Sequence, residues 1–207
     1  MIKKIVPILI LIILLTVRLN LALGQDSIRG NYSLVGQIPK KNSLKNIIFE
    51  EFINFGCSHC NKLHKASKNF RIKFSEKVKF VDIPILFRGQ NDAPLRLYFI
   101  AKKIGKGDLV KNELFKASFE HGVNVFDPGI VNFLARSLGI NKEFQMEKQK
   151  DWVNELIAEG KIKAEKYRIT GTPSIIIQQA MKMDIGRYGS MSNFIKKIPE
   201  TIEDLIQ

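Results

Sequence analysis

Cysteine, histidine and tryptophan are scarce in this chain, whose 207 residues include two cysteines, three histidines and one tryptophan. Two cysteines are too few for a small fold held together by several disulfides, and there is no second cysteine cluster to complete a zinc site. Long apolar runs are also lacking, because the run Ile5–Val17 falls short of the roughly 20 residues that span a membrane. Internal repeats and low-complexity linkers are absent from the sequence. The length therefore predicts one domain with a sizeable core.

Acidic residues are outnumbered, with 20 Asp and Glu against 33 Lys and Arg and a formal net charge of +13. A basic balance is typical of proteins that bind nucleic acid, anionic membrane surfaces or acidic substrates. Here the lysines are scattered instead of being gathered beside aromatic residues (Lys65, Lys68, Lys73, Lys77, Lys102, Lys103, Lys148 and Lys150). We interpret them as solvated helix faces and expect no nucleic-acid partner.

The first 24 residues have the organisation of a secretory signal peptide. Two lysines precede the apolar run, Arg18 interrupts it, and small residues stand three and one positions before Gln25. We therefore predict export and removal of residues 1–24. An uncleaved membrane anchor is the alternative. Export also fits a cysteine pair that cycles as a disulfide, because such chemistry operates in oxidising compartments.

The two cysteines follow an apolar run at two-residue spacing. Residues 47–55 read as a strand buried on both faces, and Gly56 ends it before the tetrapeptide C-S-H-C. Apolar residues then recur every three or four positions, as in a helix (Leu63, Ala66, Phe70 and Phe74). Strand, C-x-x-C and helix form the arrangement of a dithiol redox site, since a helix N-terminus favours a thiolate at the first sulfur.

This arrangement assigns Cys57 as the nucleophile and Cys60 as the resolving thiol, with His59 adding positive charge or a hydrogen bond to the first sulfur. A metal site built from the two cysteines and His64 is an alternative, although a fourth ligand is hard to find. A c-type haem needs histidine after the second cysteine, and Asn61 stands there. An inert structural disulfide would restrain so short a loop little.

The remaining chain alternates between sheet and helix signals. Residues 77–87 predict a second strand that forms a right-handed strand–helix–strand unit with the first. Helical patterns then continue to Tyr167, with a last long helix expected over residues 142–159. The sheet resumes at Ile175, residues 183–188 have the alternation of a neighbouring edge strand, and a C-terminal helix follows.

Two motifs match a known family. F-x-C-x-H-C after a strand (residues 55–60) and G-T-P before a later strand (residues 171–173) resemble the thioredoxin fold, and more closely the exported DsbA-type thiol:disulfide oxidoreductases. The resemblance runs from Ile47 to the C-terminus and implies an α/β thioredoxin-like fold with a helical insertion between its βαβ and ββα halves. The implied organisation is residues 1–24 as signal peptide, 25–91 as the N-terminal part with C-x-x-C, 92–167 as helical insertion, and 168–207 as the C-terminal part with the cis-proline loop.

The resemblance also implies roles for residues outside the dithiol. The Thr172–Pro173 bond is expected to be cis and to present backbone for pairing with an extended substrate beside the nucleophile; a trans proline starting an edge strand is the alternative. Glu51 matches the family's buried acid, which relays the resolving cysteine's proton, with Glu50 as rival and a structural salt bridge as another role. Ser58 departs from the family's usual proline, which leaves the degree of oxidising power open.

The function implied by the resemblance is the introduction of disulfides into exported proteins, in the bacterial periplasm, by a monomer without a bound cofactor or metal. Its partners would be reduced or unfolded exported proteins and a membrane reoxidising partner of DsbB type. An isomerase or reductase of the same fold is the enzymatic alternative. A redox-inactive chaperone or a metal-binding protein is the alternative from a different class.

Overall fold

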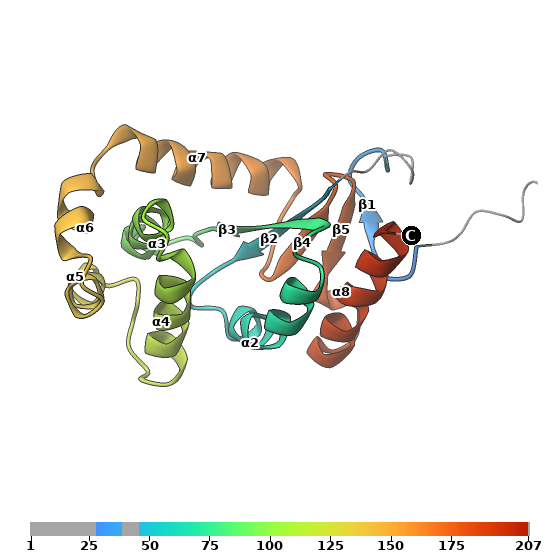
Figure 1. The fold of residues 1–207 in the computed structure, drawn as a ribbon, viewed down its shortest axis with the longest axis horizontal. Helices are drawn as coiled ribbons and strands as arrows, with labels where there is room; N and C mark the ends of the chain where they lie inside the picture. Colours follow the sequence, from blue (N-terminus) through green and yellow to red (C-terminus); the bar gives the residue numbers. More distant parts are fainter. Residues whose placement is uncertain (1–27, 39–45, 207) are drawn as a thin grey trace, which may run out of the picture.

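The computed structural model describes residues 28–38 and 46–206 of the chain (Figure 1). The predicted signal peptide and its cleavage site lie outside these ranges. Within them, no helix has both the length and the apolar character needed to cross a membrane.

A mixed five-stranded sheet in the order β1-β5-β4-β2-β3 forms the centre of the fold. The central strand β2 is buried along almost its whole length, pairs in parallel with β3 and antiparallel with β4, and thereby joins the two halves of the chain. The strands are β1 (Ser33–Leu34), β2 (Ile47–Ile53), β3 (Val78–Pro84), β4 (Ser174–Ile177) and β5 (Met181–Asp184). The strand expected beside β4 is present as β5, but its expected bounds of 183–188 were wrong because Ile185–Arg187 form a 3-10 helix. Its expected edge position was also wrong, because β1 pairs with its outer side.

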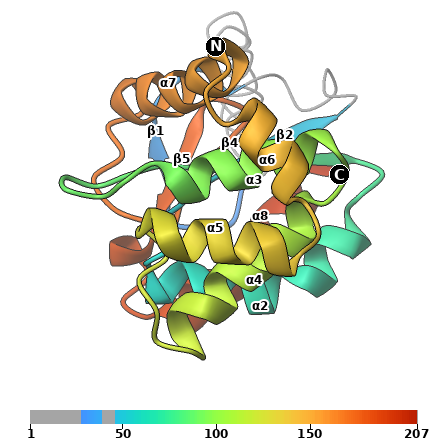
Figure 2. The same cartoon turned by 90° about the vertical axis from the view of Figure 1, so that its left-hand side faces the viewer.

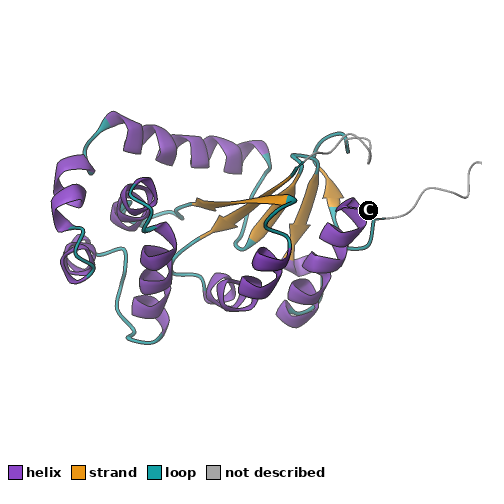
Figure 3. Ribbon diagram, in the orientation of Figure 1, coloured by secondary structure: helices purple, strands orange, loops and turns teal. Residues whose placement is uncertain are grey.

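Helices cover both faces of this sheet (Figure 3). Helices α2 (Ser58–Lys73) and α8 (Met191–Ile206) pack together on one face, where Phe49, Phe70 and Phe194 lie in a shared apolar cluster. Helix α7 (Asp151–Lys166) lies over the other face, where its C-terminal part contacts a smaller cluster around Phe52 and Ile176. Layers of this kind are what a sheet with apolar residues on both faces requires.

The helices between β3 and β4 form a second apolar core beside the end of the sheet (Figure 2). Before α7 they are α3 (Ala93–Lys103), α4 (Gly107–Phe119), α5 (Pro128–Ser137) and α6 (Asn141–Glu147). The expected single helix over residues 142–159 is wrong, because a turn at residues 148–150 separates α6 from α7. Across this turn the indole N–H of Trp152 donates to Glu147 Oε2 at 2.7 Å, and Lys103 Nζ lies 4.4 Å from the indole ring. The predicted order of βαβ unit, inserted helices and ββα unit is confirmed.

Candidate active site

Cys57 occupies the N-cap position of α2, at the carboxyl end of the central strand. Its backbone is extended, and its Sγ accepts a hydrogen bond from the Cys60 N–H at 3.3 Å. Cys57 is half-buried, whereas Cys60 is fully buried one turn into the helix. Both cysteines are free thiols, so the structure describes the reduced pair, with only the first sulfur open to solvent.

The loop before β4 lies directly against this first sulfur. The Thr172–Pro173 peptide bond is cis, as the resemblance implies, and the carbonyl oxygen of Thr172 lies 3.1 Å from Cys57 Sγ. Pairing of Ser174 with Phe52 in the sheet brings the loop to the end of β2, although the two contacting residues are 115 positions apart. The Thr172 hydroxyl is buried and has no partner within hydrogen-bond distance among the described residues.

The surroundings move the pKa values of the two thiols in opposite directions. The Cys60 thiol donates toward Cys57 and, against the opposing effect of burial, lowers the pKa of Cys57 to about 5, with help from Thr172 and the backbone N–H groups of Cys60 and His59. Burial, together with the neighbouring Cys57, raises the pKa of Cys60 above its ordinary value. A thiolate therefore forms at the accessible sulfur while the buried one keeps its proton.

His59 acts on Cys57 through its backbone. Its imidazole is exposed and has no hydrogen-bond partner among residues 28–38 and 46–206. Ser58 is also exposed, at the first position of the helix. The first turn of α2 contains no acidic residue, so the positive end of the helix dipole stays uncompensated beside the sulfur.

Asn54 organises the active-site turn and was not singled out from the sequence. It is buried, its side-chain oxygen accepts from the Gly56 N–H at 3.0 Å, and its backbone oxygen accepts from the Cys57 N–H at 3.0 Å. Its amide nitrogen donates to Ile85 O at 2.8 Å and to Gln90 Oε1 at 2.7 Å. An Asn two residues before a glycine at the end of an apolar run is a signal for such a turn.

The inserted helices also touch the active-site turn. Ser118 of α4 donates a hydrogen bond to the carbonyl of Phe55 at 3.0 Å. The ring of Phe126, from the loop between α4 and α5, lies so close to Gly56 that an added Cβ would meet it at 2.8 Å. No sequence pattern marked Phe126, because this contact depends on how the insertion packs against the sheet.

The two adjacent acids of β2 are both buried but face opposite helices. Glu50 faces α7, where Lys163 Nζ lies 2.9 Å from its Oε1, and its other oxygen is buried without a hydrogen-bond partner within residues 28–38 and 46–206. Glu51 faces α2, the helix that carries the cysteines, and accepts from Arg71 Nη2 at 2.6 Å. Burial raises the pKa of Glu51, and Arg71 opposes this effect. Glu51 is therefore the acid on the same side of the sheet as the dithiol.

Arg71 links Glu51 to a second buried acid that the sequence analysis did not identify. In the β2–β3 register Glu51 lies opposite Asp82, and Arg71 Nη2 also lies 2.6 Å from Asp82 Oδ1. Lys111 of α4 donates to the other oxygen of Asp82. Burial alone would raise the pKa of Asp82, but Lys111 and Arg71 lower it to about 2. These four residues form a buried ion cluster.

His64 lies apart from the sulfurs, with its ring stacked 5.3 Å from that of Phe115 and its Nε2 3.5 Å from Asn112 Oδ1. Within the described part of the chain, no group of three or more His, Cys, Asp and Glu side chains is arranged to hold a metal ion.

A dithiol at the start of the first helix after a central strand, with a cis-proline loop against its first sulfur, defines the thioredoxin-like class of redox proteins. The particular family follows from comparison with known proteins. The DSBA-like thioredoxin domain family matches residues 48–196, and the chain belongs to this family.

Curated relatives bear the name thiol:disulfide interchange protein DsbA. The protein of Pseudomonas syringae pv. tomato is 26% identical over 154 residues, covering 74% of this chain and 72% of the relative. That of Pseudomonas aeruginosa is 24% identical over 155 residues, covering 74% of this chain and 73% of the relative. This chain is thus a thiol:disulfide oxidoreductase of the DsbA-like kind.

Solved structures show the same fold. Oxidoreductase DsbA from Xylella fastidiosa superposes with a TM-score of 0.71 at 18% identity, covering 87% of this chain and 97% of that one. DsbA from Pseudomonas aeruginosa gives a TM-score of 0.67 at 20% identity, covering 80% and 86%. The predicted thioredoxin-like fold is confirmed.

Proposed function

We propose that this chain is exported, acts in the bacterial periplasm and introduces disulfide bonds into reduced proteins there. Cys57 and Cys60 are the redox pair, and Thr172 and Pro173 form the platform on which an extended substrate segment lies. The signal-peptide pattern of residues 1–24 supports export. The family membership supports the chemistry.

The reaction begins with the oxidised pair. A substrate thiolate attacks Cys57 Sγ, the Cys57–Cys60 bond breaks, and Cys60 leaves with the electron pair and takes up a proton. A second substrate thiolate then attacks the substrate sulfur of this mixed disulfide, and Cys57 leaves as a thiolate. The substrate loses two electrons and the enzyme gains them. A membrane partner of DsbB type restores the oxidised pair.

The observation that carries this proposal is the opposite behaviour of the two sulfurs. A pKa of about 5 makes Cys57 a good leaving group at neutral pH, since a thiolate of low pKa departs readily. Cys60 is fully buried and its pKa is raised, so it favours the protonated state once released. Glu51, on the same side of the sheet, is the candidate to exchange that proton.

The same low pKa makes the disulfide oxidising, because it stabilises the reduced enzyme. A pKa of about 5 lies about two units below pH 7. Each unit corresponds to about 1.36 kcal/mol, and halving the sum for solvent screening at a half-buried sulfur leaves about 1.4 kcal/mol, or about 30 mV. Isomerase or reductase activity is the second candidate, because Ser58 departs from the family's usual proline and leaves the degree of oxidising power open.

Trapping of mixed disulfides tests the mechanism. Cys60→Ala should accumulate mixed disulfides with periplasmic proteins, whereas Cys57→Ala should accumulate none, because only Cys57 is accessible to a substrate thiolate. Non-reducing gels of cells expressing each variant give the result, and equal trapping by both variants would refute the assignment. Equilibration of the wild type with glutathione separates the candidates, since a potential near about −270 mV indicates a reductase and one near about −120 mV an oxidase.

A further inference from the structure

A cavity of about 830 Å³ lies between the second half of α2, strand β3 and the turn that joins α3 to α4. This volume lies within the range of pockets that hold small molecules. The cavity shares no lining residue with the dithiol or the cis-proline loop. Its lining includes the cationic side chains of Lys68, Arg71, Lys102 and Lys111.

The charges in this lining do not balance locally. Of the two carboxylates in the lining, Asp82 is already engaged by Arg71 and Lys111. Asp108 is the other lining carboxylate, but its side chain is 99% exposed, so it points to solvent at the rim. The cavity therefore keeps an excess of positive charge near its mouth.

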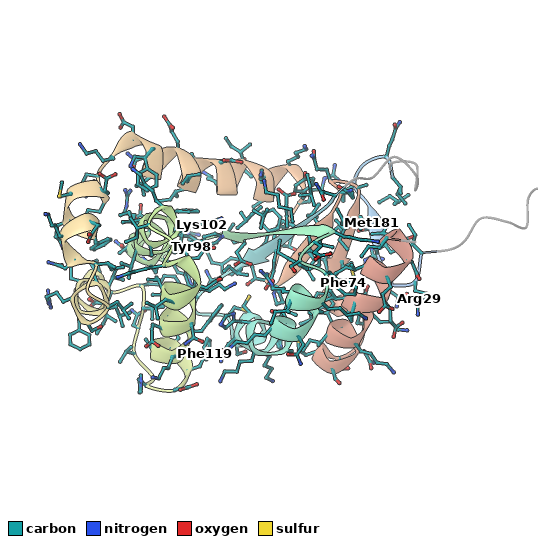
Figure 4. The ribbon with its side chains drawn as sticks, in the orientation of Figure 1. Arg29, Phe74, Tyr98, Lys102, Phe119 and Met181 are labelled. Atoms are coloured by element: carbon teal, nitrogen blue, oxygen red, sulfur yellow. The ribbon has the colours of Figure 1, made fainter. Side chains whose placement is uncertain are left out.

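Lys68 and Lys102 are the cations without a counter-charge, since neither forms an ion pair with any residue in the described ranges. Lys68 projects from α2 and Lys102 from the last turn of α3, so they approach the cavity from two different helices. Lys102 is labelled in Figure 4 beside Tyr98, and its Nζ lies 5.9 Å from the tyrosine ring, which also lines the cavity.

The N-terminus of α4 adds a further positive contribution. Gly107 is the first residue of this 13-residue helix, lines the cavity and lies against Lys102, whose Cα would be 3.1 Å from an added Cβ. Among the described residues, no side-chain hydrogen bond caps this helix end. Its first N–H groups and the helix dipole therefore favour an anion at this wall, and Asp108 offsets them only in part.

His64 and Asn112 provide neutral polar groups at the cavity wall. Burial, together with the charge of Lys111, lowers the pKa of His64 to about 4, so its ring is uncharged at neutral pH. An anion bound beside the ring would stabilise the imidazolium and raise this pKa. A rise in the pKa of His64 would therefore show that an anion occupies the cavity.

We propose that this cavity is a binding site for a small anion with two or more carboxylate or phosphate charges, held mainly by Lys68, Lys102 and the first turn of α4. The site is separate from the dithiol, and the proposal does not depend on the proposed function. Carboxylate and phosphate ligands share the required chemistry. Comparing the binding of a carboxylate probe with that of a phosphate probe distinguishes the two ligand classes.

The experiment titrates wild-type protein with citrate and, separately, with inorganic pyrophosphate, at constant ionic strength and with chloride as the reference. Calorimetry measures affinity, and NMR follows the pKa of His64, whose signal is identified by its loss in His64→Gln. We expect saturable binding of at least one probe, with the His64 pKa raised by about one unit or more. The probe that binds more tightly identifies the ligand class.

The variant Lys68→Gln/Lys102→Gln should bind the preferred probe at least about tenfold more weakly, because two charged contacts are lost. Lys62→Gln/Lys116→Gln removes the same charge from α2 and α4 outside the cavity and should stay within about twofold of the wild type. Absence of saturable binding, equal weakening by both double variants, or binding of an acidic peptide but of neither small anion would overturn the proposal. Urea unfolding curves of both double variants test whether they are folded.

Discussion

The two ends of helix α2 carry polar groups under opposite conditions. At its start, the Cys57 sulfur accepts from the Cys60 N–H, no acidic residue stands in the first turn, and the sulfur is left partly open to solvent. In its last turns, Arg71 lies between two buried carboxylates, Glu51 and Asp82. At the reactive end the Cys60 thiol, Thr172 and nearby N–H groups lower the pKa of Cys57, whereas at the structural end opposite charges neutralise one another. The low pKa of Cys57 therefore depends on hydrogen-bonding groups around an accessible sulfur, and the structural end depends on ion pairs that are buried in the fold.

The largest expected change comes from breaking the structural end. Arg71→Met should lower the free energy of unfolding by about 3 kcal/mol, because Glu51 loses the one ion-pair partner that it has in the described part of the chain and Asp82 keeps Lys111. Urea unfolding at neutral pH measures this. The control variant Lys65→Met, also on α2, removes an exposed ion pair with Glu120. It should lower the free energy of unfolding by less than about 1 kcal/mol. Similar losses in both variants would mean that the buried ion cluster has no special structural weight.

A smaller effect is expected from oxidising the reactive end. At pH 7 the reduced protein should be more stable than the oxidised protein by about 1.4 kcal/mol, since the depressed pKa of Cys57 stabilises the folded thiolate. The contribution is complete above the unfolded pKa of about 8.5 and is lost as pH falls through about 5. The restraint that the bond places on the unfolded chain does not depend on the charge of the sulfur, so the change in this difference between pH 7 and pH 4 isolates the thiolate contribution.

Urea melts of both redox forms at pH 7 and pH 4 measure this difference. We expect it to shrink or vanish at pH 4. Cys57→Ser/Cys60→Ser should show no dependence on redox conditions at either pH. If the oxidised form unfolds at a higher urea concentration than the reduced form at pH 7, the Cys57–Cys60 disulfide is not strongly oxidising.

The smallest effect concerns a single hydroxyl at the reactive end. Thr172→Val should raise the pKa of Cys57 by less than about one unit, because Thr172 ranks behind the Cys60 thiol among the groups that lower it and its hydroxyl has no hydrogen-bond partner among the described residues. Thiolate absorbance near about 240 nm, followed against pH, gives the pKa. Thr172→Ser keeps the hydroxyl and should titrate like the wild type. If Val and Ser variants titrate alike, the hydroxyl does not act on the sulfur.

Local pattern was enough to predict the reactive end of α2 but not the structural end. A strand run, C-x-x-C and a helical period are all contained within residues 47–74, and the G-T-P motif located the opposing loop through a family resemblance. The ion cluster depends on the register that sets Glu51 opposite Asp82 and on where α4 packs, neither of which short-range spacing determines.

Three further features of the structure also depend on packing that short-range sequence patterns do not determine. Alternation along β2 requires Glu50 and Glu51 to face opposite ways, but only the packed helices decide which of them lies under the cysteines. Strand β1 has two residues, too few for a periodic signal to show that it covers β5. The turn between α6 and α7 occurs within a continuous helical pattern and is held by the contact of Trp152 with Glu147.

Cys57 and Thr172, which are in contact, lie 115 positions apart in the sequence, so the two sides of the active site are synthesised at different times. The ribosome completes both cysteines first and reaches Thr172 on the order of ten seconds later. During that interval the nascent chain holds both cysteines without the loop whose carbonyl contacts Cys57 Sγ in the folded protein. The loop that contacts the first sulfur is therefore completed only late in synthesis, when β4 pairs with β2.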